Sequence, residues 1–197
     1  MSESIYQRSL QAAVVNYQTM SALEDQLHNA AALCIEVFQR GGKLLICGNG
    51  GSAAEAQHLA GELMGRYKKE RPPLPAVALT ADSALLTCIG NDYRFEEVFA
   101  RQVRGLAQPA DALIAFTTSG NSPNVLLALE AAREMNIPGI AFLGGEGGKA
   151  KLAATCTLIV PHPETARVQE GHQFLMHCLM DEIEAWFREP APQLAAI

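Results

Sequence analysis

The sequence of 197 residues is poor in charged and aromatic residues and has no long hydrophobic run. Charged residues make up 18% and hydrophobic residues 49%, whereas an average soluble domain carries about 25% charged residues. This balance excludes a disordered chain and a coiled coil. Charge or glycine interrupts each apolar stretch before the ~20 residues that a membrane helix needs, so we predict no membrane association. The acidic start, Met1-Ser2-Glu3-Ser4, lacks the basic region of a secretory signal, and we expect a cytoplasmic protein.

Basic residues and paired cysteines are also scarce. The chain has 15 lysine and arginine residues against 21 aspartate and glutamate residues, a net charge of −6. Nucleic-acid binders need a basic face to neutralise phosphates, so we predict no nucleic-acid partner. The five cysteines form no CxxC pair and each has apolar neighbours. We therefore expect reduced thiols in the core of a protein from a reducing compartment.

The apolar pattern divides the chain into N-terminal helices and an alternating α/β region. Apolar residues recur at spacings of three and four within residues 2–40, which predicts two helices. Apolar runs of strand length then alternate with helical stretches. The runs are at 44–47, 76–79, 112–116, 139–143 and 158–160, and the helical stretches at 52–64, 83–106, 122–135, 148–154 and 165–187.

Apolar runs that do not alternate with polar residues suit strands buried on both faces of a parallel sheet. We predict a single α/β domain spanning residues 1–197, with a doubly wound five-stranded parallel sheet flanked by helices. Its core covers residues 43–187 and ends in a long C-terminal helix. Residues 188–197 contain Pro190 and Pro192 and are expected to be a frayed tail.

Two predicted strands are each followed by a small polar loop that opens a helix. The loops are Gly48-Asn49-Gly50-Gly51-Ser52 and Thr117-Thr118-Ser119-Gly120-Asn121-Ser122. Free backbone N–H groups, a helix dipole and several hydroxyl groups can hold a phosphate there. The alternative is a pair of tight turns with Ser52 or Ser122 capping a helix. For the glycine-rich segment 144–148 we favour the tight turn.

Other nucleotide-binding patterns fit these loops poorly. Gly48, Gly50 and Ala53 satisfy a loose dinucleotide fingerprint, but the first acid beyond the next strand is Asp82, well past the ~20 residues expected. A P-loop needs Ser or Thr after its lysine, and Ala150 follows Lys149. The P-loop is therefore excluded.

A second group of residues could perform acid–base or metal chemistry. His58 and Glu62 are four residues apart and share one face of a predicted helix. Gln169 and His177 lie on the C-terminal helix among apolar residues. Considered alone, His58 and Glu62 could form a surface contact. Considered alone, His177 could be a core histidine. Where the two helices meet, two imidazoles, a carboxylate and an amide could bind zinc or a similar ion, and could move a proton between adjacent carbons.

These motifs, taken together, resemble the phosphoheptose isomerases of the sugar isomerase (SIS) superfamily over residues 5–187. The segments that carry the resemblance are the loop 48–52, Gln57-His58 with Glu62, Gly65-Arg66, Arg71-Pro72, Gly90-Asn91-Asp92, the loop 118–122, and Val168-Gln169-Glu170 followed by His177.

The resemblance implies an SIS-type five-stranded fold and an aldose–ketose isomerase. The expected reaction converts sedoheptulose 7-phosphate to D-glycero-D-manno-heptose 7-phosphate through an enediol, the first step of heptose supply for lipopolysaccharide or a surface glycan. It also implies a homotetramer with active sites at subunit interfaces, and one zinc ion per subunit.

The resemblance also assigns site residues. Glu62 and His177 are the expected catalytic carboxylate and its acid–base partner. The expected metal ligands are His58, Glu62, Gln169 and His177. The expected substrate-binding residues are Asn49, Gly50, Gly51, Ser52, Glu62, Asn91, Asp92, Thr117, Thr118, Ser119, Ser122 and Gln169.

Two positions depart from the family pattern, and one other function class competes. Thr117 stands where serine is common, and Ala166 stands where some members have aspartate. Non-catalytic SIS relatives associated with replication initiation bind a protein partner, but they lack the carboxylate and the histidine that this chain has at Glu62 and His177. The motifs therefore favour an enzyme.

Overall fold

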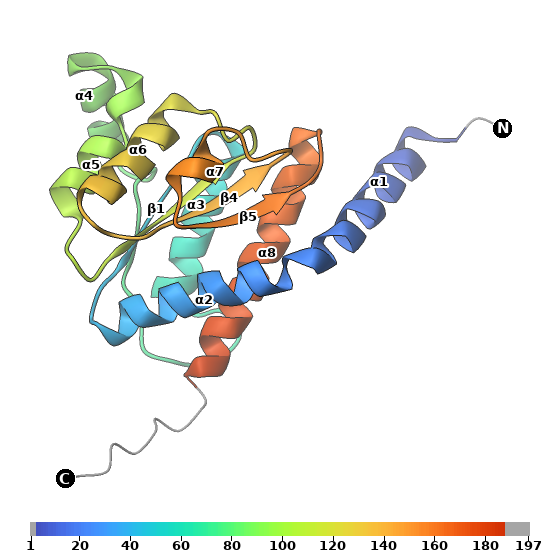
Figure 1. Ribbon diagram of the computed structural model, residues 1–197, viewed down its shortest axis with the longest axis horizontal. Helices are drawn as coiled ribbons and strands as arrows, with labels where there is room; N and C mark the ends of the chain where they lie inside the picture. Colours follow the sequence, from blue (N-terminus) through green and yellow to red (C-terminus); the bar gives the residue numbers. More distant parts are fainter. Residues whose placement is uncertain (1–2, 188–197) are drawn as a thin grey trace, which may run out of the picture.

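Five parallel strands form the central sheet of the computed structural model, which describes residues 3–187 (Figure 1). Their order across the sheet is β2-β1-β3-β4-β5. The strands are β1 (Leu44–Gly48), β2 (Ala76–Ala78), β3 (Ala112–Thr117), β4 (Gly139–Gly144) and β5 (Cys156–Val160). Every residue of β1, β3 and β4 is buried, which explains their uninterrupted apolar sequences. The predicted parallel α/β sheet is confirmed.

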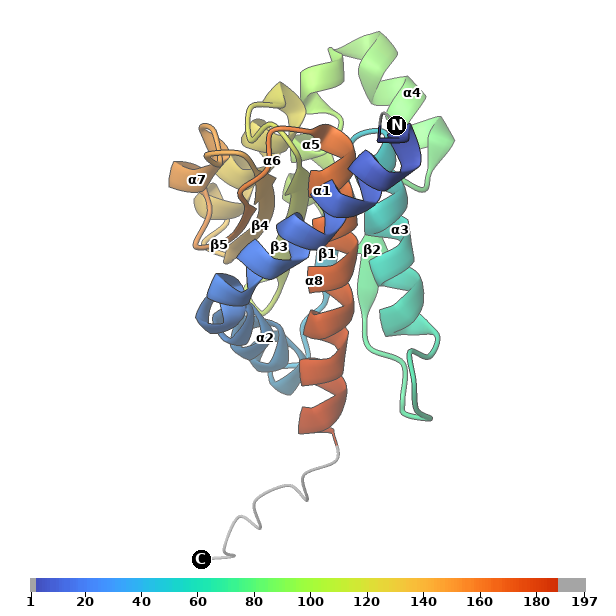
Figure 2. The same cartoon turned by 90° about the vertical axis from the view of Figure 1, so that its right-hand side faces the viewer.

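Helices cover both faces of this sheet (Figures 1 and 2). Helices α2, α3 and α8 lie on one face, and α4 to α7 lie on the other. The helices are α1 (Ile5–Thr19), η1 (Met20–Leu23), α2 (Glu24–Gln39), α3 (Gly51–Met64), α4 (Ser83–Asp92), η2 (Phe95–Glu97), α5 (Ala100–Leu106), α6 (Pro123–Glu134), α7 (Ala150–Ala153) and α8 (Thr165–Trp186).

The alternation of side chains along each strand divides the core in two. In β1, Leu44 and Ile46 pack under α2, α3 and α8, whereas Leu45 and Cys47 pack under the helices on the opposite face. Successive side chains of a strand point to opposite faces, so one short apolar run supplies both layers.

The single helix predicted for residues 83–106 is wrong. The chain forms α4, leaves the helical conformation at Tyr93 (φ −124°, ψ −96°) and Arg94 (φ −164°, ψ 157°), and then forms η2 and α5. Asn91 and Asp92 precede this break, and both have low helix propensity because their side chains compete for backbone hydrogen bonds.

The prediction that the cysteines are core thiols holds for only two of the five. Cys34 and Cys47 are fully buried, and burial raises the pKa of each thiol to about 12. Cys156 and Cys178 are partly buried, and Cys88 is exposed. Cys88 lies on α4, whose single buried residue is the neighbouring Ile89. An apolar neighbour therefore did not indicate that the Cys88 thiol is in the core. All five thiols are free.

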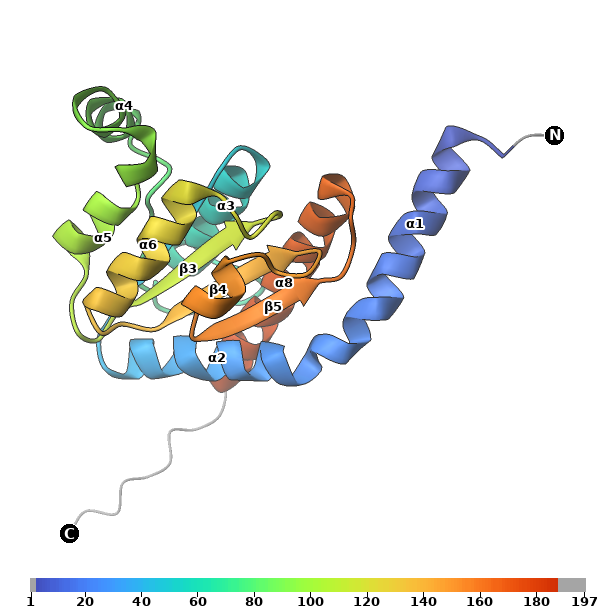
Figure 3. The ribbon, with the colours of Figure 1, turned by 45° about the horizontal axis from the view of Figure 1, so that its top comes forward.

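Helix α1 extends away from the sheet (Figure 3). Its C-terminal half contacts α8, where Asn16 Nδ2 donates to the Arg167 carbonyl at 2.8 Å. At its start, Ile5 and Tyr6 are each 75% exposed. Within residues 3–187, no helix combines the length and apolar character needed to cross a membrane. The predicted frayed tail, 188–197, lies outside the described residues.

Candidate active site

The loop after β1 is shaped by its glycines. Gly50 has φ 56° and ψ −120° and occupies the N-cap position of α3, a backbone conformation that side chains disfavour. The Ser52 N–H donates to the Asn49 carbonyl at 3.0 Å, and the Ser52 side chain is buried. At Gly51, an added Cβ would overlap the side-chain amide of Gln169, so α8 closely approaches this loop.

The loop after β3 is held by its own hydroxyl groups and by the glycine-rich segment 144–148. Thr117 Oγ1 and Ser122 Oγ share a hydrogen bond at 3.1 Å. The Ala150 N–H donates to the Gly120 carbonyl at 2.9 Å. Within segment 144–148, the Gly147 N–H donates to the Gly144 carbonyl at 3.0 Å. The segment is a tight turn, as predicted, with positive φ at Gly145, Gly147 and Gly148.

A pocket of about 300 Å³ lies between these two loops and the start of α8, and we name it the loop pocket. It is lined by Asn49, Gly50, Gly51, Ser52, Phe116, Thr117, Thr118, Ser122, Thr165 and Gln169. Behind it, the side-chain amides of Asn49 and Asn124 form two reciprocal hydrogen bonds, each 2.8 Å long. None of the lining residues is charged.

Three helices begin beside the loop pocket, and none of the three has a side-chain hydrogen bond at its N-cap. The N-cap residues are Gly50 for α3, Ser122 for α6 and Glu164 for α8. The first N–H groups of a helix need partners from outside the helix, and the positive end of the dipole favours an anion. The pocket therefore suits a phosphate without a lysine or arginine.

Four of the predicted substrate-binding residues do not line the loop pocket: Glu62, Asn91, Asp92 and Ser119. Glu62 lies further along α3. The Ser119 hydroxyl accepts a hydrogen bond from the Asn121 N–H at 3.1 Å, within its own turn. Asn91 and Asp92 are exposed residues of α4, joined by a hydrogen bond of 2.8 Å from Asn91 Nδ2 to Asp92 Oδ1. Helix α4 packs on the opposite face of the sheet from α3 and α8.

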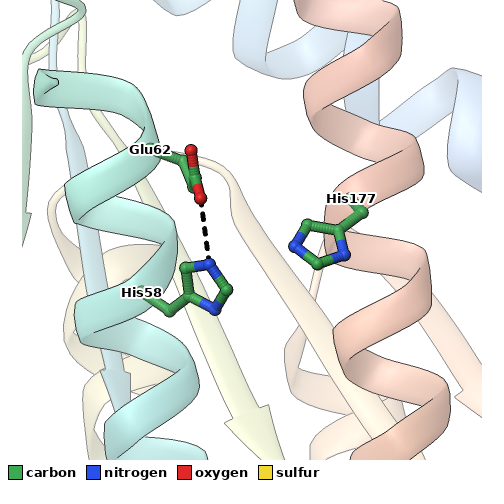
Figure 4. Close-up of side chains that lie close together, drawn as sticks. All are labelled: His58, Glu62 and His177. Atoms are coloured by element: carbon green, nitrogen blue, oxygen red, sulfur yellow. Dashed lines mark hydrogen bonds and ion pairs between the residues drawn. The ribbon is translucent and has the colours of Figure 1, made fainter. Parts of the chain in front are cut away.

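The predicted catalytic residues do come together, across the junction of α3 and α8. Figure 4 shows His58 and Glu62 on α3 facing His177 on α8. His58 Nε2 donates to Glu62 Oε1 at 3.0 Å, and one donor atom from each of the three residues lies within 4.8 Å of the others. We call these three residues the His/Glu cluster. His177 is only partly buried and faces two polar side chains, so it is not a histidine packed in the core.

Two further side chains contact the His/Glu cluster. The Gln173 amide nitrogen lies 3.0 Å from His58 Nδ1 and 3.1 Å from His177 Nε2. The Tyr67 ring stacks on the His177 ring, with centroids 5.7 Å apart.

The environment of His177 favours its neutral form. Burial lowers the pKa of this imidazole below its ordinary 6.5, the neighbouring His58 lowers it further, and the Glu62 carboxylate opposes both effects. At neutral pH the ring therefore carries one N–H and one lone pair, and it can either donate or accept a proton.

The His/Glu cluster also fits a divalent metal ion. Two imidazoles and a carboxylate from two helices are the donor set of many catalytic zinc sites, and their donor atoms already converge. The fourth predicted ligand, Gln169, lies two helical turns before His177 on α8 and lines the loop pocket.

Arg71 ties the end of α3 to α8. Its guanidinium donates to the carbonyl oxygens of Glu62 and Leu63, and its Nε lies 3.6 Å from the Glu184 carboxylate. Both partners of this ion pair are almost completely buried. Arg71 therefore fixes the last turn of α3, which carries Glu62, relative to the helix that carries His177.

The sequence analysis missed Gln173 and Asn124 as site residues. Gln173 stands midway between Gln169 and His177 at the same four-residue spacing, and this periodicity was the available signal. No sequence signal pointed to Asn124, because its role depends on contact with Asn49, which is distant in the sequence. His172, on the same helix, is a core residue whose Nε2 donates to the Leu143 carbonyl at 3.0 Å.

Known proteins are similar to this chain in sequence and in fold. A family model described as SIS domain matches residues 6–144. The phosphoheptose isomerase of Trichlorobacter lovleyi is 50% identical over 183 residues, covering 92% of this chain and 93% of the relative. That of Aquifex aeolicus is 46% identical over 184 residues, covering 93% and 96%.

Solved structures of phosphoheptose isomerases have the same fold. The enzyme from Neisseria gonorrhoeae superposes with a TM-score of 0.86 at 42% identity, covering 90% of this chain and 96% of the other. The enzyme from Francisella tularensis gives a TM-score of 0.87 at 38% identity, covering 90% and 95%.

Proposed function

This chain belongs to the phosphoheptose isomerase family of SIS-domain proteins, and we propose that it interconverts sedoheptulose 7-phosphate and D-glycero-D-manno-heptose 7-phosphate. The observation that carries the proposal is the position of the His/Glu cluster beside the loop pocket. Helix α3 runs from one to the other, and Ser52 and His58 are separated by about 9 Å of helical rise. A sugar phosphate with its phosphate and carbonyl at opposite ends fits this arrangement.

Glu62 and His177 are the proposed acid–base pair. The Glu62 carboxylate removes a proton from C1 of the ketose, the C1–H electron pair forms the C1=C2 double bond, and His177 gives a proton to O2. His177 then takes the proton of O1, and Glu62 returns a proton to C2 as C1 becomes the aldehyde. Positioned proton transfer of this kind contributes about 10²–10⁴-fold to the rate.

We also propose that the His/Glu cluster holds a divalent ion, zinc in particular. A bound ion would polarise the sugar carbonyl. His58, Glu62 and His177 supply converging donor atoms for it. The additional assignment of Gln169 as a metal ligand stays a prediction, as do the substrate contacts of Asn91, Asp92 and Ser119.

The wider biological setting is part of the same proposal. We expect a cytoplasmic homotetramer with active sites at subunit interfaces, which supplies heptose phosphate for lipopolysaccharide or another surface glycan. The exposed apolar residues at the start of α1 support assembly, and the five free thiols support a reducing compartment. Asn91 and Asp92 are exposed on α4, where they could meet a neighbouring subunit.

The test is turnover of sedoheptulose 7-phosphate in D₂O, followed by proton NMR. We expect the aldose product with deuterium at C2. Glu62→Gln should lower kcat by about 10²–10⁴-fold and change KM less. Glu130→Gln, an exposed carboxylate on α6, is the matched control and should behave as wild type. Full turnover by Glu62→Gln would refute the assigned base, and no turnover by the wild-type protein would favour a partner-binding protein.

A further inference from the structure

Tyr67 contacts His177, and the reaction proposed above gives it no role. Its ring lies on the His177 ring with centroids 5.7 Å apart and an angle of 18° between the two planes. This is the offset-stacked arrangement that aromatic rings favour, in which the centroids are about 4.5–7 Å apart. The phenol ring of Tyr67 therefore covers one face of the imidazole.

The orientation of the His177 imidazole depends on such contacts. The last torsion of a histidine side chain has broad energy wells, so neighbouring groups have to fix the plane of the ring. The His58 ring meets the His177 ring edge to face, with centroids 5.3 Å apart, and the Gln173 amide nitrogen lies 3.1 Å from His177 Nε2. Tyr67 adds the flat surface against which the imidazole plane is held.

The backbone beside Tyr67 is anchored to α8, although it follows α3 in the sequence. Lys68 Nζ donates to both carboxylate oxygens of Asp181, at 2.6 and 2.8 Å. The Lys68 N–H donates to Glu184 Oε1 at 3.3 Å. Asp181 lies one helical turn after His177 on α8. Tyr67 is therefore held against the same helix that carries the imidazole on which it stacks.

We propose that Tyr67 is a positioning residue for His177, whose ring keeps an imidazole nitrogen directed at His58 and Glu62. This inference rests on the acid–base role proposed above for His177. Catalysis is sensitive to orientation, and a misplacement of about 1 Å can lower a rate about 10²-fold. Tyr67 does not line the loop pocket, so loss of its ring should affect turnover more than binding of the phosphate.

The first experiment compares the steady-state kinetics of three variants. Tyr67→Leu removes the ring and should lower kcat by up to about 100-fold with little change in KM. Tyr67→Phe keeps the ring, loses only the hydroxyl and should retain most of the wild-type kcat. Phe38→Leu removes a ring from a partly buried position on α2. It is the matched control for lost packing and should keep the wild-type kcat.

The second experiment observes the imidazole itself by NMR, in protein freed of metal with a chelator and labelled with ¹³C at its histidines. The signals of His177 are identified by their absence from the spectrum of His177→Gln. The ring current of a stacked aromatic ring shifts the imidazole protons upfield. Tyr67→Leu should lose this shift, and Tyr67→Phe should keep it.

Four results would each overturn the assignment. A wild-type kcat in Tyr67→Leu would show that the ring is not needed for turnover. Equal losses of kcat in Tyr67→Leu and Tyr67→Phe would transfer the effect to the hydroxyl. An equal loss in Phe38→Leu would make it a general effect of lost packing. Unchanged His177 signals in Tyr67→Leu would exclude the stack.

Failure of the proposed function gives a different result. If the wild-type protein does not isomerise the sugar, the proposed reaction fails for wild type and variants alike. The NMR comparison of Tyr67→Leu with Tyr67→Phe needs no turnover, so it still decides whether the Tyr67 ring orients His177.

Discussion

At Gly51, the absence of a side chain makes room for the Gln169 amide. Because the amide is the far end of a flexible side chain, an added methyl group displaces it and leaves the fold intact. We expect Gly51→Ala to raise KM for the sugar phosphate several-fold with a smaller effect on kcat, measured by steady-state kinetics.

Gly105→Ala is the control for this prediction, because a Cβ at Gly105 in α5 meets nothing within 4 Å. That variant should retain wild-type KM and gain up to about 1 kcal/mol in helix stability. An unchanged KM in Gly51→Ala would show that Gln169 does not contact the substrate.

His177 makes the stability of the metal-free protein depend on pH. Its pKa in the folded state is lowered below the ordinary 6.5 by burial and by His58, so the unfolded chain binds a proton more readily. Stability therefore falls as the pH is lowered through the range just below 6.5. Urea unfolding with a chelator present should show a shallower fall for His177→Gln than for wild type. Parallel curves would contradict this cause.

Single residues of the site were predictable to the extent that their role depends on local sequence. Gly50 and Ser52 follow an apolar strand, and a helix follows them, so their place in a loop at the sheet edge was predictable. Ser119 fits the same pattern, yet its hydroxyl accepts a bond within its own turn. Gln173 and Asn124 depend on contacts between distant elements, which a spacing pattern does not encode.

Among the elements, α3 and α8 are joined by a buried ion pair. Arg71 and Glu184 are 4% and 3% exposed, and removal of one partner leaves a buried charge unpaired. Arg71→Ala should lower the free energy of unfolding by about 3–5 kcal/mol, measured by urea denaturation. It should also lower kcat, because the last turn of α3 carries Glu62.

Lys68→Ala supplies the comparison, since Lys68 and its partner Asp181 are both about half exposed. Removal of Lys68 should lower the free energy of unfolding far less than removal of Arg71, because solvent screens an exposed ion pair. If both variants lowered the free energy of unfolding equally, the ion pair of Arg71 and Glu184 would contribute no more to stability than a surface contact.

Strands were easier to predict than helix ends. The runs at 44–47 and 139–143 appear as β1 and β4 with one added residue each, because burial on both faces demands an unbroken apolar sequence. The break between α4 and α5 was missed, since Tyr93 and Arg94 have no glycine or proline beside them. The low helix propensity of Asn91 and Asp92 was the one sequence signal of the break.

At the scale of the whole molecule, α1 exposes apolar side chains that the rest of the described chain does not cover. Tyr6 is 75% and Leu10 51% exposed. If α1 packs against another subunit, replacing both residues by serine should reduce the mass in solution from that of the proposed tetramer to that of a smaller species, measured by light scattering. Gln11→Ala, an exposed polar position on the same helix, should keep the wild-type mass. A tetramer retained by the double variant would exclude α1 from the assembly.

The strand order β2-β1-β3-β4-β5 has a consequence for how this site could evolve. After β1 the chain forms β2 at one edge of the sheet, and it then returns to form β3, β4 and β5 on the other side of β1. Helix α3 follows β1 on one face of the sheet, and α6 follows the adjacent strand β3 on the opposite face. The two connections diverge, and a crevice opens between them at this topological switch point. The crevice is a product of chain winding, so substitutions in the two loops can change which ligand binds while the cavity itself persists.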